Sequence, residues 1–231
     1  NHPGATGDGI LLAQKVGADL VDMKQIQAHP TATPDGTLIS ESVRGDGAIL
    51  VNAKGVRFTN ELLTRDVVSN NELKQPGKFA WIVFDKKTSE AAKLIQEYIH
   101  MGLAVTADNY ADLAKKMDVP SDALVATMKH YTEMQAAGKD TDFARPDMPE
   151  ALTPFYAIKV QPAVHHTMGG VHINTKAEVI NTKGNVIPGL FAAGEVTGGV
   201  HGGNRLGGNA QADIITFGRI AGQSANAYLH Q

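Results

Sequence analysis

The chain has 231 residues, of which 42% are hydrophobic and 19% charged, and it contains no cysteine. These values are typical of a globular protein, and without cysteine the chain cannot form disulfides, thiolate nucleophiles or iron–sulfur ligands. A net charge of −3 without a lysine- or arginine-rich run argues against nucleic acid as a partner, and no apolar stretch approaches the roughly 18 residues of a membrane span. No metal site is expected.

The first predicted element is a helix close to the start of the chain. Thr6 or Asp8 is a suitable N-cap, Ile10, Leu11 and Val16 would form its apolar face, and Gly17 would end it. The pattern predicts a helix that packs on one side.

Strands and helices then alternate through the middle of the chain. The predicted strands are Ala48–Val51, Val56–Phe58 after a turn, and Ala80–Asp85. The predicted helices are about 88–99, "TADNYADLAKKM", and "PSDALVATMKHYTEMQAAG" with Ser121 as its cap and Leu124, Met128 and Tyr131 at helical spacing. The proline-rich segment 142–154 is predicted to be a loop.

The last part of the sequence predicts strands followed by one long helix. "PGLFAAGE" is typical of a buried strand, and a helix rich in Gly, Ala and Ser is expected from about Gly207 to Leu229. The order of elements indicates an α+β protein in which residues of roughly 29–164 form a lobe inserted into a domain built from the two ends.

Five of the nine histidines fit a structural interpretation, and three others stand out. The structural group is His2, His100, His130, His172 and His230. His29 precedes Pro30, which forces an extended backbone, and a hydroxyl follows at Thr31. His165 and His166 are adjacent, so on an extended segment they point to opposite sides, and one of them could face a substrate.

The charged side chains near these histidines leave two interpretations open. Glu41 and Arg44 are three residues apart, and Arg65 is next to Asp66, and both patterns are common in surface ion pairs. "GGNRLGGN" (202–209) immediately precedes the last helix, where free N–H groups and the helix dipole favour an anion, and Arg205 adds a planar fork suited to a carboxylate. Together the cationic groups suit a small, multiply charged anion.

Several of these stretches, taken together, resemble one protein family. They are "ATGDG", "IQAHPT", "SESVRGDGAILVNAKGVRFTNE", "TRD", "VHHTMGG", "PGLFAAGEVTGGVHGGNRLGGNA" and "DIITFGRIAG". In sequence and order they resemble flavoprotein fumarate reductases of the soluble flavocytochrome c type, within the succinate dehydrogenase/fumarate reductase flavoprotein family. The resemblance covers essentially the whole chain.

The resemblance implies a fold and a cofactor. In that family a capping domain is inserted between two segments of a split FAD-binding domain. Residues 1–28 correspond to the end of the first segment, 29–164 to the capping domain and 165–231 to the returning segment; the family's N-terminal βαβ part is absent here. FAD would be bound non-covalently, and the electron donor would be a domain or protein outside this chain.

The resemblance also implies roles for individual residues. Arg65 matches the proton donor, and Glu41 and Arg44 match its proton-relay partners. Residues matching substrate contacts are His29 and Ser40 on one carboxylate and His165 and Arg205 on the other, with Glu41 and Gly208 also at the substrate. Residues matching FAD contacts are Asp8, His166, Glu195, Ala210 and Gln211. Two positions depart from the family, which usually has threonine at position 40 and often isoleucine at position 211.

The expected activity is FAD-dependent reduction of fumarate to succinate, as in anaerobic respiration, by hydride transfer from flavin N5 and protonation by an arginine. One alternative is reduction of another unsaturated acid such as urocanate or an acrylate, although two cationic sets favour a dicarboxylate. The other alternative is a chain that binds no flavin and has no activity on its own, because the family's glycine-rich FAD fingerprint is missing here.

Overall fold

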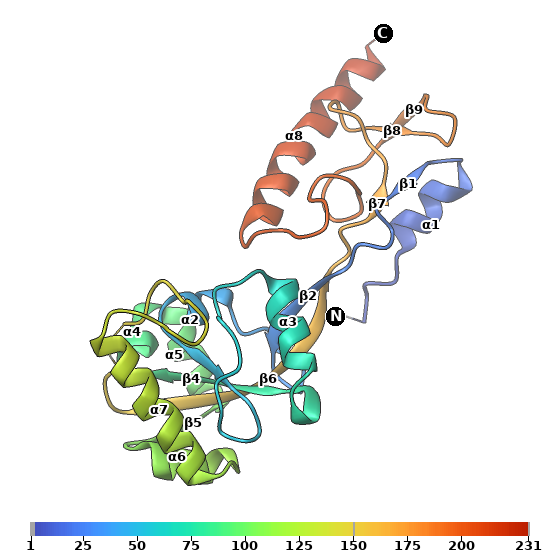
Figure 1. Ribbon diagram of the computed structural model, residues 1–231. Coiled ribbons are helices and arrows are strands. Elements are labelled where there is room, and N and C mark those ends of the chain that lie inside the picture. Colours follow the sequence, from blue (N-terminus) through green and yellow to red (C-terminus); the bar gives the residue numbers. More distant parts are fainter. Residues whose placement is uncertain (1–2, 150, 231) are drawn as a thin grey trace. The chain divides into compact units, whose positions relative to one another are not determined.

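Two separate stretches of the chain, Asn1–Ala28 and Val164–Gln231, come together in one unit, and the intervening segment His29–Ala163 forms a second. We call them the terminal unit and the middle unit (Figure 1). The computed structural model describes residues 3–149 and 151–230, so the interpretation of His2 lies outside the described residues.

A five-stranded sheet dominates the middle unit. Its strands are β2 (Gln27–Ala32), β3 (Ile49–Val51), β4 (Ala80–Asp85), β5 (Ala104–Ala107) and β6 (Phe155–His166). The order is β2-β6-β4-β3, and β5 also pairs with β6. The pairs of β4 with β3 and β6 are antiparallel, with Ile82 opposite Leu50 and Ile158. The first residues of β2 and the last of β6 belong to the terminal unit.

Helices cover both faces of this sheet. They are α2 (Glu41–Gly45), α3 (Arg65–Leu73), the 3-10 turn η1 (Pro76–Lys78), α4 (Lys86–Ala91), α5 (Lys93–His100), α6 (Tyr110–Met117) and α7 (Ser121–Ala136). Successive strand residues point to opposite faces. Ile49 and Val51 therefore join one core with side chains of α6 and α7, and Leu50 joins another with side chains of α2, α3 and α5. Because both faces are covered, β4 reads as an unbroken apolar run, "AWIVF".

The middle unit confirms most predicted elements and corrects three. The helix expected at 88–99 is two helices, because Ala92 adopts an extended conformation (φ −145°, ψ 139°) between α4 and α5. Val56–Phe58 is not a strand, and only Arg57 bridges back to Val51. Pro120, rather than Ser121, is the N-cap of α7. The loop predicted at 142–154 is confirmed in its described residues.

The terminal unit has short strands and a small core. Its elements are α1 (Asp8–Lys15), β1 (Leu20–Val21), β7 (Gly170–Val171), β8 (Glu178–Ile180), β9 (Val186–Phe191) and α8 (Asn209–Leu229). β1 pairs with β7 and β8 with β9, all antiparallel. One cluster of buried side chains consists of Ala13, Ala18, Val171 and Val179, with partly buried apolar residues packed around it.

Three expectations for this unit were wrong. Gly7, in the left-handed region at φ 79°, is the N-cap of α1, and neither Thr6 nor Asp8 takes that place. Leu11 is 54% exposed and Val16 59% exposed, so they do not form a buried face. β9 is likewise exposed to half-buried rather than buried. The last helix is confirmed, and Gly208 (φ 82°) is its N-cap.

The glycine pair at 169–170 is explained by packing of backbone on backbone. A Cβ atom on Gly169 would lie 2.3 Å from the carbonyl oxygen of Asp22, and one on Gly170 would lie 2.2 Å from that of Val196. No side chain fits at such distances. These two glycines therefore admit neighbouring protein segments.

Among the described residues, no helix combines the length and apolar character needed to cross a membrane.

Candidate functional site

The carboxylate of Glu41 bridges two arginines in the middle unit. Its Oε2 atom lies 2.8 Å from Nη2 of Arg65, and its Oε1 atom lies 3.4 Å from Nη2 of Arg44. The two guanidinium groups are buried, at 1% side-chain exposure for Arg44 and 7% for Arg65. The interpretation of these residues as ordinary surface ion pairs is therefore wrong.

Two helix starts place these side chains. Ser40 is the N-cap of α2, and its hydroxyl oxygen accepts a hydrogen bond from the amide of Ser42 at 3.2 Å. Glu41 follows at the first helical position, where a carboxylate also interacts favourably with the helix dipole. Arg65 is the first residue of α3, after Thr64. The start of α3 therefore presents the guanidinium to the start of α2.

Burial and charge act on Arg44 in opposite directions. Burial lowers the pKa of Arg44 and the positive charge of Arg65 lowers it further, while Glu41, Glu61 and Glu72 raise it; the net effect is a lowered pKa. The guanidinium is thus less strongly basic than a solvated one.

The hydrogen bonds of His29 fix which ring nitrogen carries the proton. The Thr31 amide donates to Nδ1 of His29 at 3.3 Å, and the Thr31 hydroxyl donates to the carbonyl of Ile39 at 2.8 Å. Nδ1 is therefore an acceptor, and Nε2 of the neutral ring is the donor. His29 is fully buried on β2. A buried N–H of this kind suits one oxygen of a carboxylate.

In the terminal unit, His166 is the buried member of the histidine pair and His165 is half-buried. The amide of Met168 donates to Nδ1 of His166 at 3.1 Å, so Nε2 is again the donor. Burial lowers the pKa of His166, and Arg205 and His201 lower it further against the opposing effect of Glu195. His166 is therefore held in its neutral form, as a hydrogen-bond donor without charge.

Arg205 lies buried in the glycine-rich loop before α8. Its carbonyl accepts a hydrogen bond from Nε2 of Gln27 at 2.6 Å, and the same nitrogen donates to Oδ1 of Asn204 at 3.0 Å. Gln27 is fully buried and far away in sequence, so it fixes a loop whose glycines would otherwise leave it flexible. The predicted anion site at the start of α8 thus has a supported arginine.

A groove of about 330 Å³ in the terminal unit suits part of a cofactor with hydroxyl groups. It is lined by Gly4–Ile10, Thr167, Glu195 and Val196. Asp8 and Glu195 bring carboxylates that accept hydrogen bonds, and the small residues around them leave backbone accessible. The amide of Thr167 donates to Oε1 of Glu195 at 3.1 Å, which orients that side chain. A small-residue groove with two acceptors fits FAD.

The predicted site residues divide between the two units. The middle unit brings together Ser40, Glu41, Arg44 and Arg65 and carries His29 on β2; the terminal unit carries Asp8, His165, His166, Glu195, Arg205, Gly208, Ala210 and Gln211. Ala210 and Gln211 are in the first turn of α8, and the Gln211 amide donates to the carbonyl of Gly208 at 2.9 Å.

Sequence reasoning missed a histidine–aspartate pair in the terminal unit. Nε2 of His201 lies 3.2 Å from Oδ2 of Asp213, and the His201 ring stands edge-on to that of His166 at 5.4 Å. Asp213 is buried in the first part of α8. The spacing of twelve residues gave no signal, because it depends on how the glycine loop folds back.

It also missed a set of buried charges in the middle unit. Arg57, Glu61, Asp140 and Arg145 are all buried and interact through ion pairs. Arg57 and Glu61 are four residues apart, but this segment is not helical, so the spacing gave no usable signal. Glu72 on α3 is another buried acid. Burial raises the pKa of Glu72, and this effect exceeds the lowering effects of Arg44 and of the Ala80 amide. The resulting pKa is about 9.

Comparison with known proteins identifies the family. A family model described as "FAD binding domain" matches residues 1–210. Because this match covers most of the sequence, the chain belongs to the FAD binding domain family.

Individual relatives agree with the sequence resemblance. A "Fumarate reductase (cytochrome)" of Shewanella frigidimarina is 54% identical over 99% of this chain and 40% of that protein. An "NADH:fumarate oxidoreductase" of Klebsiella pneumoniae is 48% identical over 97% of this chain and 25% of that protein. The solved open conformation of a flavocytochrome c3 fumarate reductase matches with a TM-score of 0.79 and 52% identity, over 97% of this chain and 40% of that one. The resemblance to flavoprotein fumarate reductases is confirmed, and the chain spans well under half the length of these relatives.

Proposed function

We propose that the whole protein reduces fumarate to succinate with FAD as its cofactor. The observation that carries the proposal is the carboxylate of Glu41 between the buried guanidinium groups of Arg65 and Arg44. Such an arrangement can hold a proton at a buried position and replace it after use. The similarity to fumarate reductases supports fumarate as the substrate.

Each unit carries a set of donors that suits a carboxylate. In the middle unit these are the Nε2–H of His29 and the hydroxyl of Ser40. In the terminal unit they are His165, Arg205 and Gly208. A substrate carboxylate held by such donors is oriented, and positioning of this kind contributes roughly 7–11 kcal/mol to lowering a barrier.

FAD, when bound, would supply hydride from N5 to one alkene carbon. Asp8, His166, Glu195, Ala210 and Gln211 would hold it through non-covalent contacts. A neutral His166 donates a hydrogen bond without adding charge, and Glu195 accepts one. The electrons would come from a domain or protein outside this chain.

Arg65 would give its proton to the other alkene carbon, which completes addition of a hydride and a proton across the double bond. A solvated arginine keeps its proton. Here the carboxylate of Glu41, at 2.8 Å, returns a proton to Arg65, and Arg44 lies on the other side of the same carboxylate. General acid catalysis of this kind typically contributes 10²–10⁴-fold.

The middle unit would be a capping domain inserted between two segments of a split FAD-binding domain. In support, the chain leaves the terminal unit after Ala28 and returns to it at Val164. Val164 groups with the returning segment, one residue before the position expected from the sequence.

The test is oxidation of a reduced viologen dye by the whole protein with fumarate, urocanate and acrylate in parallel. Fumarate should be turned over fastest, because it engages both donor sets. If urocanate or acrylate is clearly faster, the dicarboxylate proposal fails. Acid denaturation should release all the flavin into the supernatant; flavin that stays with the precipitated protein would contradict non-covalent binding.

A further inference from the structure

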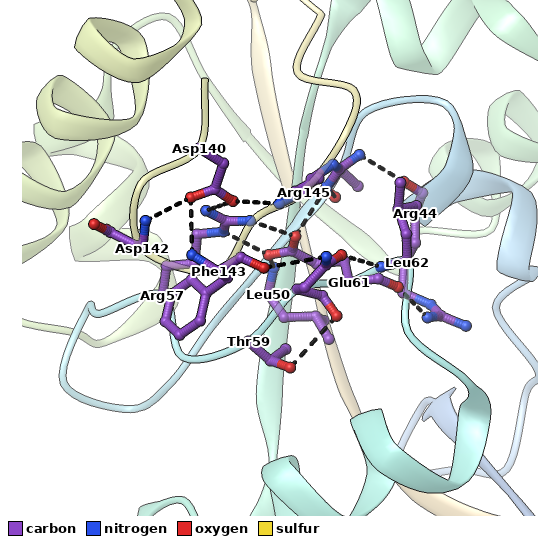
Figure 2. Close-up of polar contacts among 12 residues, drawn as sticks. Arg44, Leu50, Arg57, Thr59, Glu61, Leu62, Asp140, Asp142, Phe143 and Arg145 are labelled. Atoms are coloured by element: carbon purple, nitrogen blue, oxygen red, sulfur yellow. Dashed lines mark hydrogen bonds and ion pairs between the residues drawn. The ribbon is translucent and has the colours of Figure 1, made fainter. Parts of the chain in front are cut away.

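Glu61 is the centre of a buried polar network in the middle unit (Figure 2). Its carboxylate accepts hydrogen bonds from the Leu50 amide at 3.1 Å, from Nε and Nη2 of Arg57 at 2.9 Å each, and from Nη1 of Arg145 at 3.0 Å. The side chains of Glu61 and Arg145 are fully buried. A carboxylate with four such donors has a fixed orientation.

Asp140 completes the charge balance of this network. It lies 2.8 Å from Nη1 of Arg57 and accepts hydrogen bonds from the amides of Asp142, Phe143 and Arg145. Two cations thus face two anions. Burial lowers the pKa of Arg57, but the contacts with Glu61 and Asp140 outweigh it, and the net pKa is raised. The network also ties the segment after α7 to the strands of the sheet.

The network reaches Arg44 at two points. Nη1 of Arg44 donates to the backbone carbonyl of Glu61 at 2.5 Å, and Nη2 of Arg145 donates to the backbone carbonyl of Arg44 at 2.9 Å. Arg145 is anchored independently by the carbonyls of Ala48 at 2.7 Å and Asp147 at 2.7 Å. Arg44 is therefore held at both its side chain and its backbone.

We propose that Glu61 and Arg145 are positioning residues that hold Arg44 against Glu41 for resupply of the proton to Arg65. The inference rests on the proposed function. Proton transfer requires heavy atoms within about 2.6–3.2 Å. The contact between Arg44 and Glu41 is 3.4 Å, slightly longer than this range, so any displacement of Arg44 away from Glu41 takes the pair further from the transfer distance. The Glu61 carbonyl, which accepts a hydrogen bond from the Arg44 side chain, and Arg145, which donates to the Arg44 carbonyl, limit that displacement.

The competing explanation is that the network only stabilises the fold. Arg57 offers a matched control, because it bonds the same carboxylate and is equally buried, yet it contacts Glu61 and Asp140 rather than Arg44. Arg145→Lys and Arg57→Lys each keep a positive charge and remove a guanidinium group that bonds Glu61. A single ammonium cannot reproduce the bonds of Arg145 to Glu61, Ala48, Asp147 and Arg44 together.

The experiment compares the two lysine variants in the whole protein. We would measure kcat per bound flavin, KM for fumarate, the solvent deuterium isotope effect on kcat, and Tm. Arg145→Lys should lower kcat at least tenfold, keep KM within about twofold, and increase the isotope effect, because proton resupply becomes limiting. Arg57→Lys should lower Tm but leave kcat per flavin and the isotope effect close to those of the unmodified protein.

Three results would overturn the proposal. The first is an Arg145→Lys variant with normal kcat per flavin and a normal isotope effect. The second is an equal loss of kcat in both variants. The third is an unmodified protein that does not reduce fumarate, which overturns the proposed function as well. If the unmodified protein is active, a failure concerns the positioning role alone.

If Arg145→Lys does not accumulate as folded, flavin-bound protein, the isosteric variant Glu61→Gln replaces it, with the same expected results.

Discussion

Glu41 and Arg65 are in contact at 2.8 Å, yet their exposure differs sharply, at 39% for the Glu41 side chain and 7% for that of Arg65. The carboxylate is therefore the exposed member of the pair, and the guanidinium is the buried one. A proton passed along this pair would therefore move from the exposed Glu41 inward to the buried Arg65. The difference in exposure also separates the residue that meets water from the residue proposed to meet the substrate.

Replacing Arg65 should stop the chemistry and leave binding largely intact. We expect Arg65→Ala to lower kcat by about 10²–10⁴-fold, because it removes the general acid. Arg65→Lys should retain slightly more activity, since it keeps a proton but loses reach and the fork. Steady-state kinetics with fumarate would measure both. Turnover by Arg65→Ala at more than about a tenth of the unmodified rate would remove Arg65 from the acid role.

Arg205→Ala should behave differently from Arg65→Ala. Because a residue that holds the substrate contributes before and during the reaction, we expect KM to rise strongly and kcat to fall. Gln27→Ala is a useful companion, because it removes the side chain bonded to the Arg205 carbonyl and leaves the guanidinium in place. It should reproduce part of the rise in KM. An Arg205→Ala variant with unchanged KM would contradict the assignment.

Glu72 should make the protein less stable as the pH rises. Its folded pKa of about 9 lies above the ordinary value of 4.5, so the folded state retains a proton that the unfolded state loses. The free energy of unfolding then falls between about pH 4.5 and pH 9. Glu72→Gln removes this titration, and relative to the unmodified protein it should gain about 1–3 kcal/mol between pH 5 and pH 8.

Chemical denaturation at the two pH values would measure this gain. Glu90→Gln is the control, because Glu90 is 62% exposed and its replacement should give no comparable difference. An equal stability difference between Glu72→Gln and the unmodified protein at pH 5 and pH 8 would show that Glu72 titrates normally.

The middle unit should resist proteolysis better than the terminal unit. It has two clusters of large buried apolar side chains, whereas the buried cluster of the terminal unit consists of two alanines and two valines. Ile215 in α8 is also 69% exposed. Limited proteolysis of the 231-residue chain, followed by mass spectrometry, should leave a fragment of about residues 30–160. Early cuts inside that range would count against the prediction.

The sequence predicted those elements in which local pattern and packing agree. β4 has the predicted bounds of Ala80–Asp85, because an apolar run ending in an N-cap aspartate carries its own signal. The break at Ala92 could not be foreseen, since alanine favours helix and only the surrounding structure imposes the extended conformation.

The same distinction applies to the site. Glu41, Arg44 and Arg65 were found through family motifs, because their own spacing is that of common surface pairs. Arg145 was not found, since its partner Glu61 is 84 residues away and no local pattern joins them. Likewise, the burial of Arg44 depends on elements that fold over it from elsewhere in the chain.

The N-cap at Ser40 limits which residues evolution or an engineer can place there. Starting α2 requires a short side-chain acceptor, which restricts the position to serine, threonine, asparagine, aspartate or, less well, glycine. Receiving a carboxylate requires a donor without negative charge, which excludes aspartate and glycine. Asparagine meets both demands only with a longer, planar side chain. Serine and threonine are therefore almost the only residues that meet both requirements at position 40. A selection for activity from a library randomised at this codon should recover those two.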